Sequence, residues 1–171
     1  AIAVIRKEIF PKDAKGQARI PVDPNFVAAL AVYHDTDEIL TGDMPTPVKY
    51  FNPAIQQAYK DVEKEAVKKL LDMLPEELVP AYRELLAPSK EEAGVVQAVK
   101  IVKAADRISA LIKCIEEAKA GNKEFLSAEK TIRASIEKTI RENDLPEAEF
   151  FMERFVPAYS KTLDELESAD D

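Results

Sequence analysis

The sequence is poor in glycine and cysteine and has no long hydrophobic run, and each shortage excludes a class of protein. Four glycines are too few for a glycine-rich phosphate-binding loop. The one cysteine, Cys114, has no second cysteine to pair with, which favours a reducing compartment. No stretch of about 18 uncharged apolar residues is present, so we expect no transmembrane helix. Since no signal peptide is visible either, we expect a cytoplasmic location.

Acidic residues outnumber basic ones, at 32 Asp and Glu against 24 Lys and Arg, which gives a formal net charge of −8 at pH 7. A nucleic-acid polymer binds to a cationic surface, so this balance argues against such a partner. A single nucleotide is not excluded, because a local site or a metal ion can hold one. The 171 residues are 46% hydrophobic and 33% charged, which is typical of one folded domain.

Apolar residues recur at i, i+3 and i+4 along the chain, and alternating β-branched runs are nearly absent, which predicts an all-α fold. Proline, glycine and polar residues divide the chain into a loop at 11–22, helices at 1–10, 25–40, 53–73, 75–88, 90–121, 127–143 and 146–157, and an acidic tail at 162–171. Because the chain begins inside an apolar run, we expect the first helix to be incomplete. We interpret the charges from Glu63 to Lys69 as a solvated helix face.

The single histidine, His34, is followed directly by Asp35. On a helix over 25–40, where each residue turns by about 100°, both side chains lie at the border of apolar surface. A metal ion about 2–2.3 Å from each side chain could then sit near the seam between them. The alternative is that His34 is an ordinary core histidine, which is the commoner case for a histidine on such a face.

A second candidate is Asp106, which shares a face of its predicted helix with Val95, Val99, Val102 and Ala110. We expect a carboxylate in this apolar stripe to be buried. An unpaired buried charge is costly, so Asp106 would need a cation, a metal ion or several hydrogen-bond donors. A salt bridge to a basic residue of another helix is an equally good explanation.

A third candidate is Glu38 with the turn that follows it. Glu38 lies one helical turn after His34, where a carboxylate could act on a metal-bound water or protonate a leaving group. Gly42 ends the helix, and the prolines Pro45 and Pro47 keep the turn out of regular helix. A rigid polar turn could grip a small polar ligand. It could also be a plain helix stop in which Asp43 bonds its own backbone.

These three features occur in the order that is found in HD-domain metal-dependent phosphohydrolases. The chain most closely resembles the bacterial 5′-deoxynucleotidases of that superfamily, the YfbR-like group. The resemblance runs from about Ala28 to Leu166, and its most specific part is the run Tyr33-His34-Asp35-x-x-Glu38-x-Leu40-Thr41-Gly42-Asp43-x-Pro45-Thr46-Pro47-Val48-Lys49-Tyr50-Phe51-Asn52. It implies an HD-type helical bundle of about six or seven helices over residues 1–171.

The resemblance also implies roles for individual residues. The metal ligands would be His34, Asp35 and Asp106, and Glu38 would act on the attacking water or the leaving group. The nucleotide would contact Asp43, Met44, Pro45 and Thr46, with Asp43 placed to read the deoxyribose; Asp35 and Asp106 would face the substrate too. The cofactor would be a divalent ion such as Mn²⁺, Co²⁺ or Zn²⁺, among which these ligands do not choose.

The expected activity is hydrolysis of deoxyribonucleoside 5′-monophosphates to a deoxynucleoside and phosphate, and the group's members imply a homodimer. The chain departs from the family at one place. The family's first metal-binding histidine and an Arg-Trp pair belong to a helix near the N-terminus, and this chain has neither a second histidine nor a tryptophan. The alternative function is therefore a nucleotide sensor or scaffold that binds without turnover.

Overall fold

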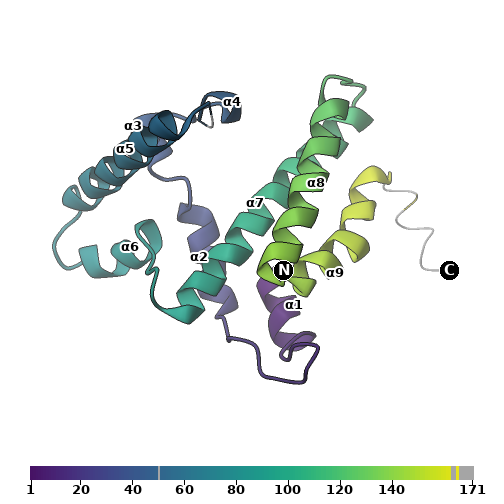
Figure 1. Cartoon of the computed structure of the whole chain (residues 1–171), viewed down its shortest axis with the longest axis horizontal. Coiled ribbons are helices and arrows are strands. Elements are labelled where there is room, and N and C mark those ends of the chain that lie inside the picture. Colours follow the sequence, from purple (N-terminus) through teal and green to yellow (C-terminus); the bar gives the residue numbers. More distant parts are fainter. Residues whose placement is uncertain (50, 163–164, 166–171) are drawn as a thin grey trace. The chain divides into compact units, whose positions relative to one another are not determined.

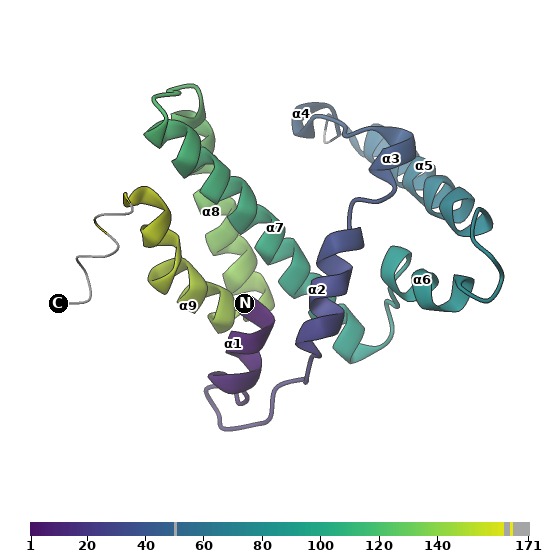
Figure 2. The ribbon, with the colours of Figure 1, turned by 180° about the vertical axis from the view of Figure 1, so that it is seen from behind.

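Helices joined by loops make up the computed structural model, which describes residues 1–49, 51–162 and 165, without the side chains of 46 and 47 (Figures 1 and 2). Among the described residues, seven helices have seven or more residues: α1 (Ile2–Glu8), α2 (Pro24–Tyr33), α5 (Pro53–Asp72), α6 (Val79–Leu86), α7 (Ala93–Lys119), α8 (Phe125–Asn143) and α9 (Pro146–Arg154). Shorter turns are α3 (Glu38–Thr41), α4 (Thr46–Lys49) and the 3-10 helix η1 (Val156–Ser160). No β-strand occurs among the described residues, so the all-α prediction is confirmed.

Two compact units divide the chain, and each is described by itself. One comprises Ala1–Val27 with Gln97–Asp171, and the other comprises Ala28–Val96. The interpretation of residues 1–171 as one HD-type domain stays a prediction, and most of the predicted acidic tail lies outside the described residues. Nowhere in the described chain is there a helix with both the length and the apolar character needed to cross a membrane.

In the first unit, α9 contacts α1, α8 and η1. The largest fully buried apolar side chains come from α7, α8 and the start of α9, and they are Ile101, Ile108, Leu111, Ile136 and Leu145. Cys114 is buried and free. A buried ion pair joins α1 to α9, because Arg6 Nη1 lies 2.8 Å from Glu147 Oε1 while the two side chains are 6% and 0% exposed.

A second ion pair joins the loop at 11–22 to the end of α8. Arg19 Nη1 donates to Asp144 Oδ2 at 2.6 Å, and Arg19 also donates to the Asp144 carbonyl at 3.2 Å. Asp144 is the only non-glycine with positive φ, 50°, among the described residues. The hydrogen bond from Arg19 is the main cause that holds the pKa of Asp144 below its usual value of 3.8.

The lowered pKa of Asp144 predicts a pH-dependent contribution to stability. Because the folded pKa lies below the unfolded one, the ion pair stabilises the protein above pH 3.8 and is lost as the pH falls through the folded pKa. We expect Asp144→Asn, which tolerates positive φ, to lower the free energy of unfolding at neutral pH by about 1 kcal/mol or less. Urea unfolding should show this difference shrinking in acid, and a difference that grows in acid would contradict the assignment.

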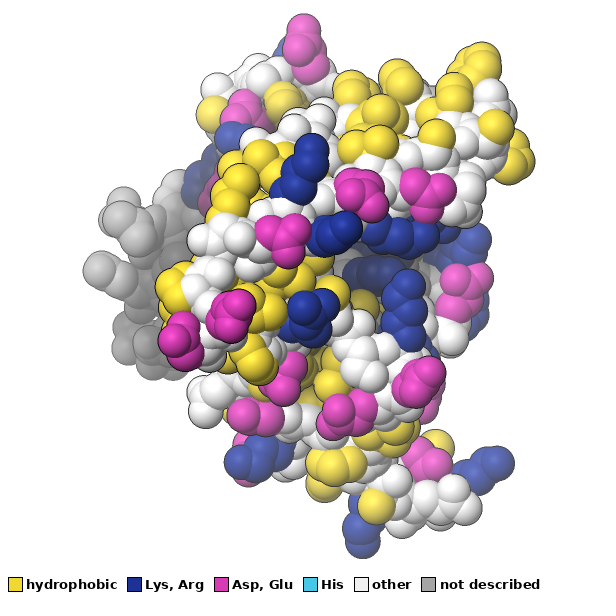
Figure 3. Space-filling view, turned by 90° about the vertical axis from the view of Figure 1, so that its left-hand side faces the viewer, with side chains coloured by type: hydrophobic (Ala, Val, Ile, Leu, Met, Phe, Trp, Pro, Cys, Tyr) yellow, Lys and Arg dark blue, Asp and Glu magenta, His cyan; other side chains and the backbone are white. Residues whose placement is uncertain are grey.

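In the second unit, α3, α4 and α6 all contact α5. The sequence predicts the start of α5 correctly, because the Asn52 side chain accepts from the Ile55 amide at 2.8 Å and Pro53 occupies the first turn. At the end of α2, the Tyr33 ring packs edge-on against Tyr82 of α6, with ring centroids 5.7 Å apart. The face of the molecule in Figure 3 carries Lys and Arg side chains beside Asp and Glu side chains, with hydrophobic side chains among them.

The helix predicted over 25–40 is wrong in its second half. Helix α2 ends at Tyr33, residues 34–37 form a turn, and α3 begins at Glu38. His34 Nδ1 contacts the Ala31 carbonyl at 2.8 Å and Thr36 Oγ1 donates to the Tyr33 carbonyl at 2.7 Å. A threonine hydroxyl that bonds a nearby carbonyl competes with the helical hydrogen bonds, and the bond from Thr36 is consistent with the break here.

Other helix boundaries also shift. Gly42 ends α3 with φ 69°, as predicted. The turn of helix α4 contains Pro47, contrary to the prediction, because proline is tolerated in the first turn of a helix. Ser89 Oγ accepts from the amides of Glu91 and Glu92 before α7, as a helix-capping serine does.

Candidate functional site

The turn at 34–37 places two metal-ligand atoms side by side. His34 Nδ1 must donate in its contact with the Ala31 carbonyl, because a carbonyl only accepts, and a neutral ring then has its lone pair on Nε2. That Nε2 lies 2.9 Å from Asp35 Oδ2, with the two side chains 33% and 54% exposed. Two acceptors this close repel unless a proton or a cation lies between them, so the pair fits a divalent metal ion. The two ligand atoms lie side by side on a turn rather than on the predicted helix, and the role of His34 and Asp35 as metal ligands stays a prediction.

Asp106 lies on α7, in the other compact unit, and its side chain is exposed. The expectation that it is buried is wrong. The buried face of α7 includes Ala104 and Ile108, and Asp106 lies about 160° around the helix from each of them. Of the predicted apolar stripe, Val102 is buried and Ala110 is exposed, so Asp106 lies outside the buried face of α7. Its role as a third metal ligand stays a prediction.

Glu38 is the first residue of α3 and is half-buried. Partial burial raises the pKa of its carboxyl above the ordinary 4.5, and the nearby charges of Asp35, Asp43 and Asp37 raise it further, against the opposing effect of Lys49. A carboxyl with a raised pKa holds a proton more readily, and this suits a group that exchanges protons during a reaction. The structure thus supports an acid–base role for Glu38 but does not test it.

Sequence reasoning missed Asp37, which is half-buried beside these groups. Burial is the main cause of its raised pKa, followed by the charges of Glu63 and Asp35. The sequence contains a signal for Asp37, because Asp35, Asp37 and Glu38 place three carboxylates within four residues. So many acidic groups in one turn and its neighbouring helix favour binding of a cation.

The predicted substrate segment follows α3. Asp43 and Pro45 are exposed and Met44 is half-buried. Thr46 begins α4, and its side chain lies outside the described part of the chain. Contact of these four residues with a nucleotide stays a prediction.

Two residues of α5 near this segment, Tyr59 and Glu63, were not predicted as site residues from the sequence. The Tyr59 hydroxyl donates to the Gly42 carbonyl at 2.9 Å, and Lys49 Nζ lies 2.7 Å from Glu63 Oε1. Glu63 is half-buried, so interpreting it as part of a solvated face was wrong for this residue. The four-residue spacing of Tyr59 and Glu63, which puts both on one face of α5, was the available signal.

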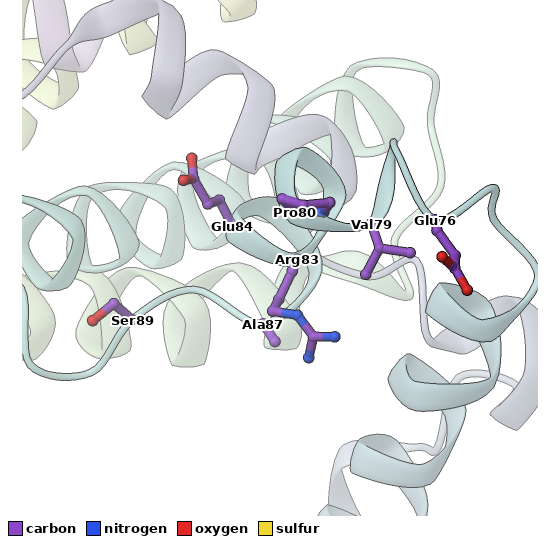
Figure 4. A pocket seen from close by; sticks show the side chains of 7 residues that line it. All are labelled: Glu76, Val79, Pro80, Arg83, Glu84, Ala87 and Ser89. Carbon is purple, nitrogen blue, oxygen red and sulfur yellow. The ribbon is translucent and has the colours of Figure 1, made fainter.

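A groove along α6 is separate from all of these residues. Its volume is about 610 Å³, and it is lined by Glu76, Val79, Pro80, Arg83, Glu84, Ala87 and Ser89 (Figure 4). None of the predicted catalytic, metal or substrate residues lines it. We therefore place the candidate site at the turn 34–37 and the segment after α3, not in this groove.

Comparison with known proteins gives the same family that the motifs indicate. Residues 1–159 match the family model described as 5′-deoxynucleotidase YfbR-like. The chain is similar to 5′-deoxynucleotidases from Erwinia tasmaniensis, at 47% identity over 85% of this chain and 70% of the relative, and from Vibrio cholerae, at 45% over 85% and 71%. It is also similar to one from Photorhabdus temperata, at 42% over 97% and 77%.

Proposed function

Because this chain belongs to the YfbR-like 5′-deoxynucleotidase family, we propose that it hydrolyses deoxyribonucleoside 5′-monophosphates to a deoxynucleoside and phosphate. The observation that carries the proposal is the pair of ligand atoms on His34 and Asp35, 2.9 Å apart, with Glu38 at the start of the next helix. The alternative of binding without turnover is not favoured, because the relatives named above are 5′-deoxynucleotidases.

The HD-domain family is metal-dependent, and we propose His34, Asp35 and Asp106 as the residues that hold a divalent ion. An imidazole nitrogen and carboxylate oxygens suit Mn²⁺, Co²⁺ or Zn²⁺. Such an ion, when bound, makes water more acidic and screens the charge of the phosphoryl group. The hydrogen bond from His34 Nδ1 to the Ala31 carbonyl supports this role, because it orients the ring whose Nε2 lies 2.9 Å from Asp35 Oδ2.

Within this proposal, Glu38 moves the proton and the segment after α3 binds the nucleotide. The Glu38 carboxylate takes a proton from the attacking water or returns one to the 5′-oxygen of the leaving deoxynucleoside. Asp43, Met44, Pro45 and Thr46 contact the nucleotide, with Asp43 placed to read the deoxyribose. Asp35 and Asp106 also face the substrate.

The activity is tested by measuring phosphate release from dAMP, dGMP and dTMP with Mn²⁺, Co²⁺ or Zn²⁺ added in turn. We expect release that depends on the metal and stops with a chelator, with deoxyribonucleotides preferred to AMP. Calorimetry that shows dAMP bound while no phosphate is released with any of the metals would contradict the proposal and favour the sensor.

The metal ligands are tested by metal content. We expect His34→Ala and Asp106→Ala each to lower the Mn²⁺ retained after dialysis by about tenfold or more. Since Asp106 is exposed, its replacement should change the free energy of unfolding of the metal-free protein by only about 0.5 kcal/mol. Asp72→Ala, at an exposed position on α5, is the matched control. Equal metal content in wild type and Asp106→Ala by elemental analysis would remove Asp106 from the ligand set.

We also propose that the chain forms a homodimer. Exposed apolar side chains at the end of α9 and in η1, including Phe155 and Tyr159, are compatible with such an interface. Light scattering of the purified chain measures the mass directly, and a monomer of 19.1 kDa over the whole accessible concentration range would contradict this proposal.

A further inference from the structure

Two residues of α5 contact the two ends of the segment Gly42–Lys49. The Tyr59 side chain is 6% exposed, and its hydroxyl donates to the Gly42 carbonyl at 2.9 Å. One turn later on the same helix, Glu63 Oε1 accepts from Lys49 Nζ at 2.7 Å. The segment carries Asp43 to Thr46 between these two contacts, so both of its ends are tied to one helix.

The two contacts form one cluster rather than two independent bonds. Lys49 Nζ lies 4.8 Å from the centre of the Tyr59 ring, which places the ammonium over the face of the aromatic. The Lys49 and Glu63 side chains are only 30% and 28% exposed. A partly desolvated pair is less screened by water than a surface pair, so it holds its geometry better.

The cluster is also tied to the helix of Glu38. The Gly42 amide donates to the Glu38 carbonyl at 2.9 Å, while the Gly42 carbonyl accepts from Tyr59. The positive φ of Gly42, 69°, turns the chain at this point. Gly42 therefore connects α3, through its amide, and the Tyr59 side chain of α5, through its carbonyl, at the start of the substrate segment.

The helices at the two ends of the segment cannot hold it in place by themselves. Helices α3 and α4 have four residues each, and a helix this short is not stable in isolation. Their contacts with α5 therefore decide the position of the segment. The hydroxyl of Tyr59 and the carboxylate of Glu63 supply the directional part of those contacts.

We propose that Tyr59 and Glu63 are positioning residues that fix the segment Gly42–Lys49 on α5 and thereby set the selectivity for the deoxyribose; this rests on the proposed function. Neither residue contacts the reacting atoms. Each acts through the backbone or side chain at one end of the segment, and the position of Asp43 between the ends follows from both.

The test compares Tyr59→Phe and Glu63→Gln with Glu65→Gln, an exposed position two residues along α5, as the matched control. Tyr59→Phe removes the hydroxyl that donates to the Gly42 carbonyl, and Glu63→Gln removes the negative charge that pairs with Lys49. Both variants keep the size of the side chain. We expect the KM for dAMP to rise roughly 3- to 10-fold, which is what the loss of one hydrogen bond corresponds to. The preference for dAMP over AMP should fall by a similar factor, and kcat should stay within about twofold.

Hydrogen exchange of the backbone amides from 43 to 49 provides a readout that does not need activity. We expect faster exchange in folded Tyr59→Phe and Glu63→Gln and unchanged exchange in Glu65→Gln. If wild type hydrolyses no deoxynucleotide, the proposed function fails and the exchange data alone decide the positioning role. Unchanged exchange in both variants, a fall in kcat with KM unchanged, or an equal effect in Glu65→Gln would overturn it.

Discussion

Replacing Glu38 by Gln is expected to lower kcat for dAMP hydrolysis by about 10²- to 10⁴-fold, the usual contribution of a positioned general acid or base. The amide of glutamine has nearly the same shape as the carboxyl but cannot take up or deliver the proton. Burial and the neighbouring carboxylates raise the pKa of Glu38, which is the direction that suits a group that exchanges protons. Phosphate release under saturating metal and substrate is the measurement.

Thermal unfolding separates this effect from a loss of structure. Glu38→Gln removes one negative charge from a group that faces Asp35, Asp37 and Asp43, so repulsion in the metal-free protein falls. The variant should therefore melt at or above the wild-type temperature while losing activity. Glu137→Gln, at an exposed position on α8, is the control for an unrelated carboxylate. A kcat within threefold of wild type would exclude proton transfer by Glu38.

Replacing Glu147 by Ala should produce the largest change in stability, a loss of about 3–5 kcal/mol in the free energy of unfolding. Glu147 is fully buried, and its Oε1 pairs with Arg6 at 2.8 Å. The variant leaves the Arg6 guanidinium buried without its carboxylate partner, while Arg6 Nε still donates to the Ile20 carbonyl at 3.3 Å. Chemical denaturation measures the change.

A double replacement tests whether the charges themselves stabilise the fold. Glu147 Oε2 makes no hydrogen bond within the described part of the chain, so the pair does not recover its full cost of desolvation. We expect Arg6→Met combined with Glu147→Leu to recover most or all of the lost stability. The exposed pair of Lys138 and Glu142 is the control, and Glu142→Ala should cost no more than about 0.5 kcal/mol. Equal losses in Glu147→Ala and Glu142→Ala would contradict the assignment of a buried pair.

The local signals in the sequence predicted the fold class and most helix starts. Asn52 and Pro53 begin α5, Ser89 lies before α7 as a capping residue, and Gly42 ends α3. These helix ends can be predicted because capping and backbone preferences involve residues only a few positions apart. The turn at 34–37 was not predicted, because the prediction there rested on apolar periodicity. His34 and Thr36 bond preceding carbonyls at this turn, and an apolar periodicity does not report such bonds.

The sequence by itself therefore determined that the chain is helical, that it carries the ordered motif from His34 to Thr46, and to which family it belongs. Only the tertiary structure decided which charges pair. Arg6 and Glu147 are 141 positions apart, and nothing local selects that partner from 24 basic and 32 acidic residues. The contacts of Tyr59 and Glu63 with the substrate segment also depend on tertiary structure, because they require α5 to fold back against α3 and α4. Local preferences are set by neighbours in the chain, whereas burial and pairing are set by neighbours in space.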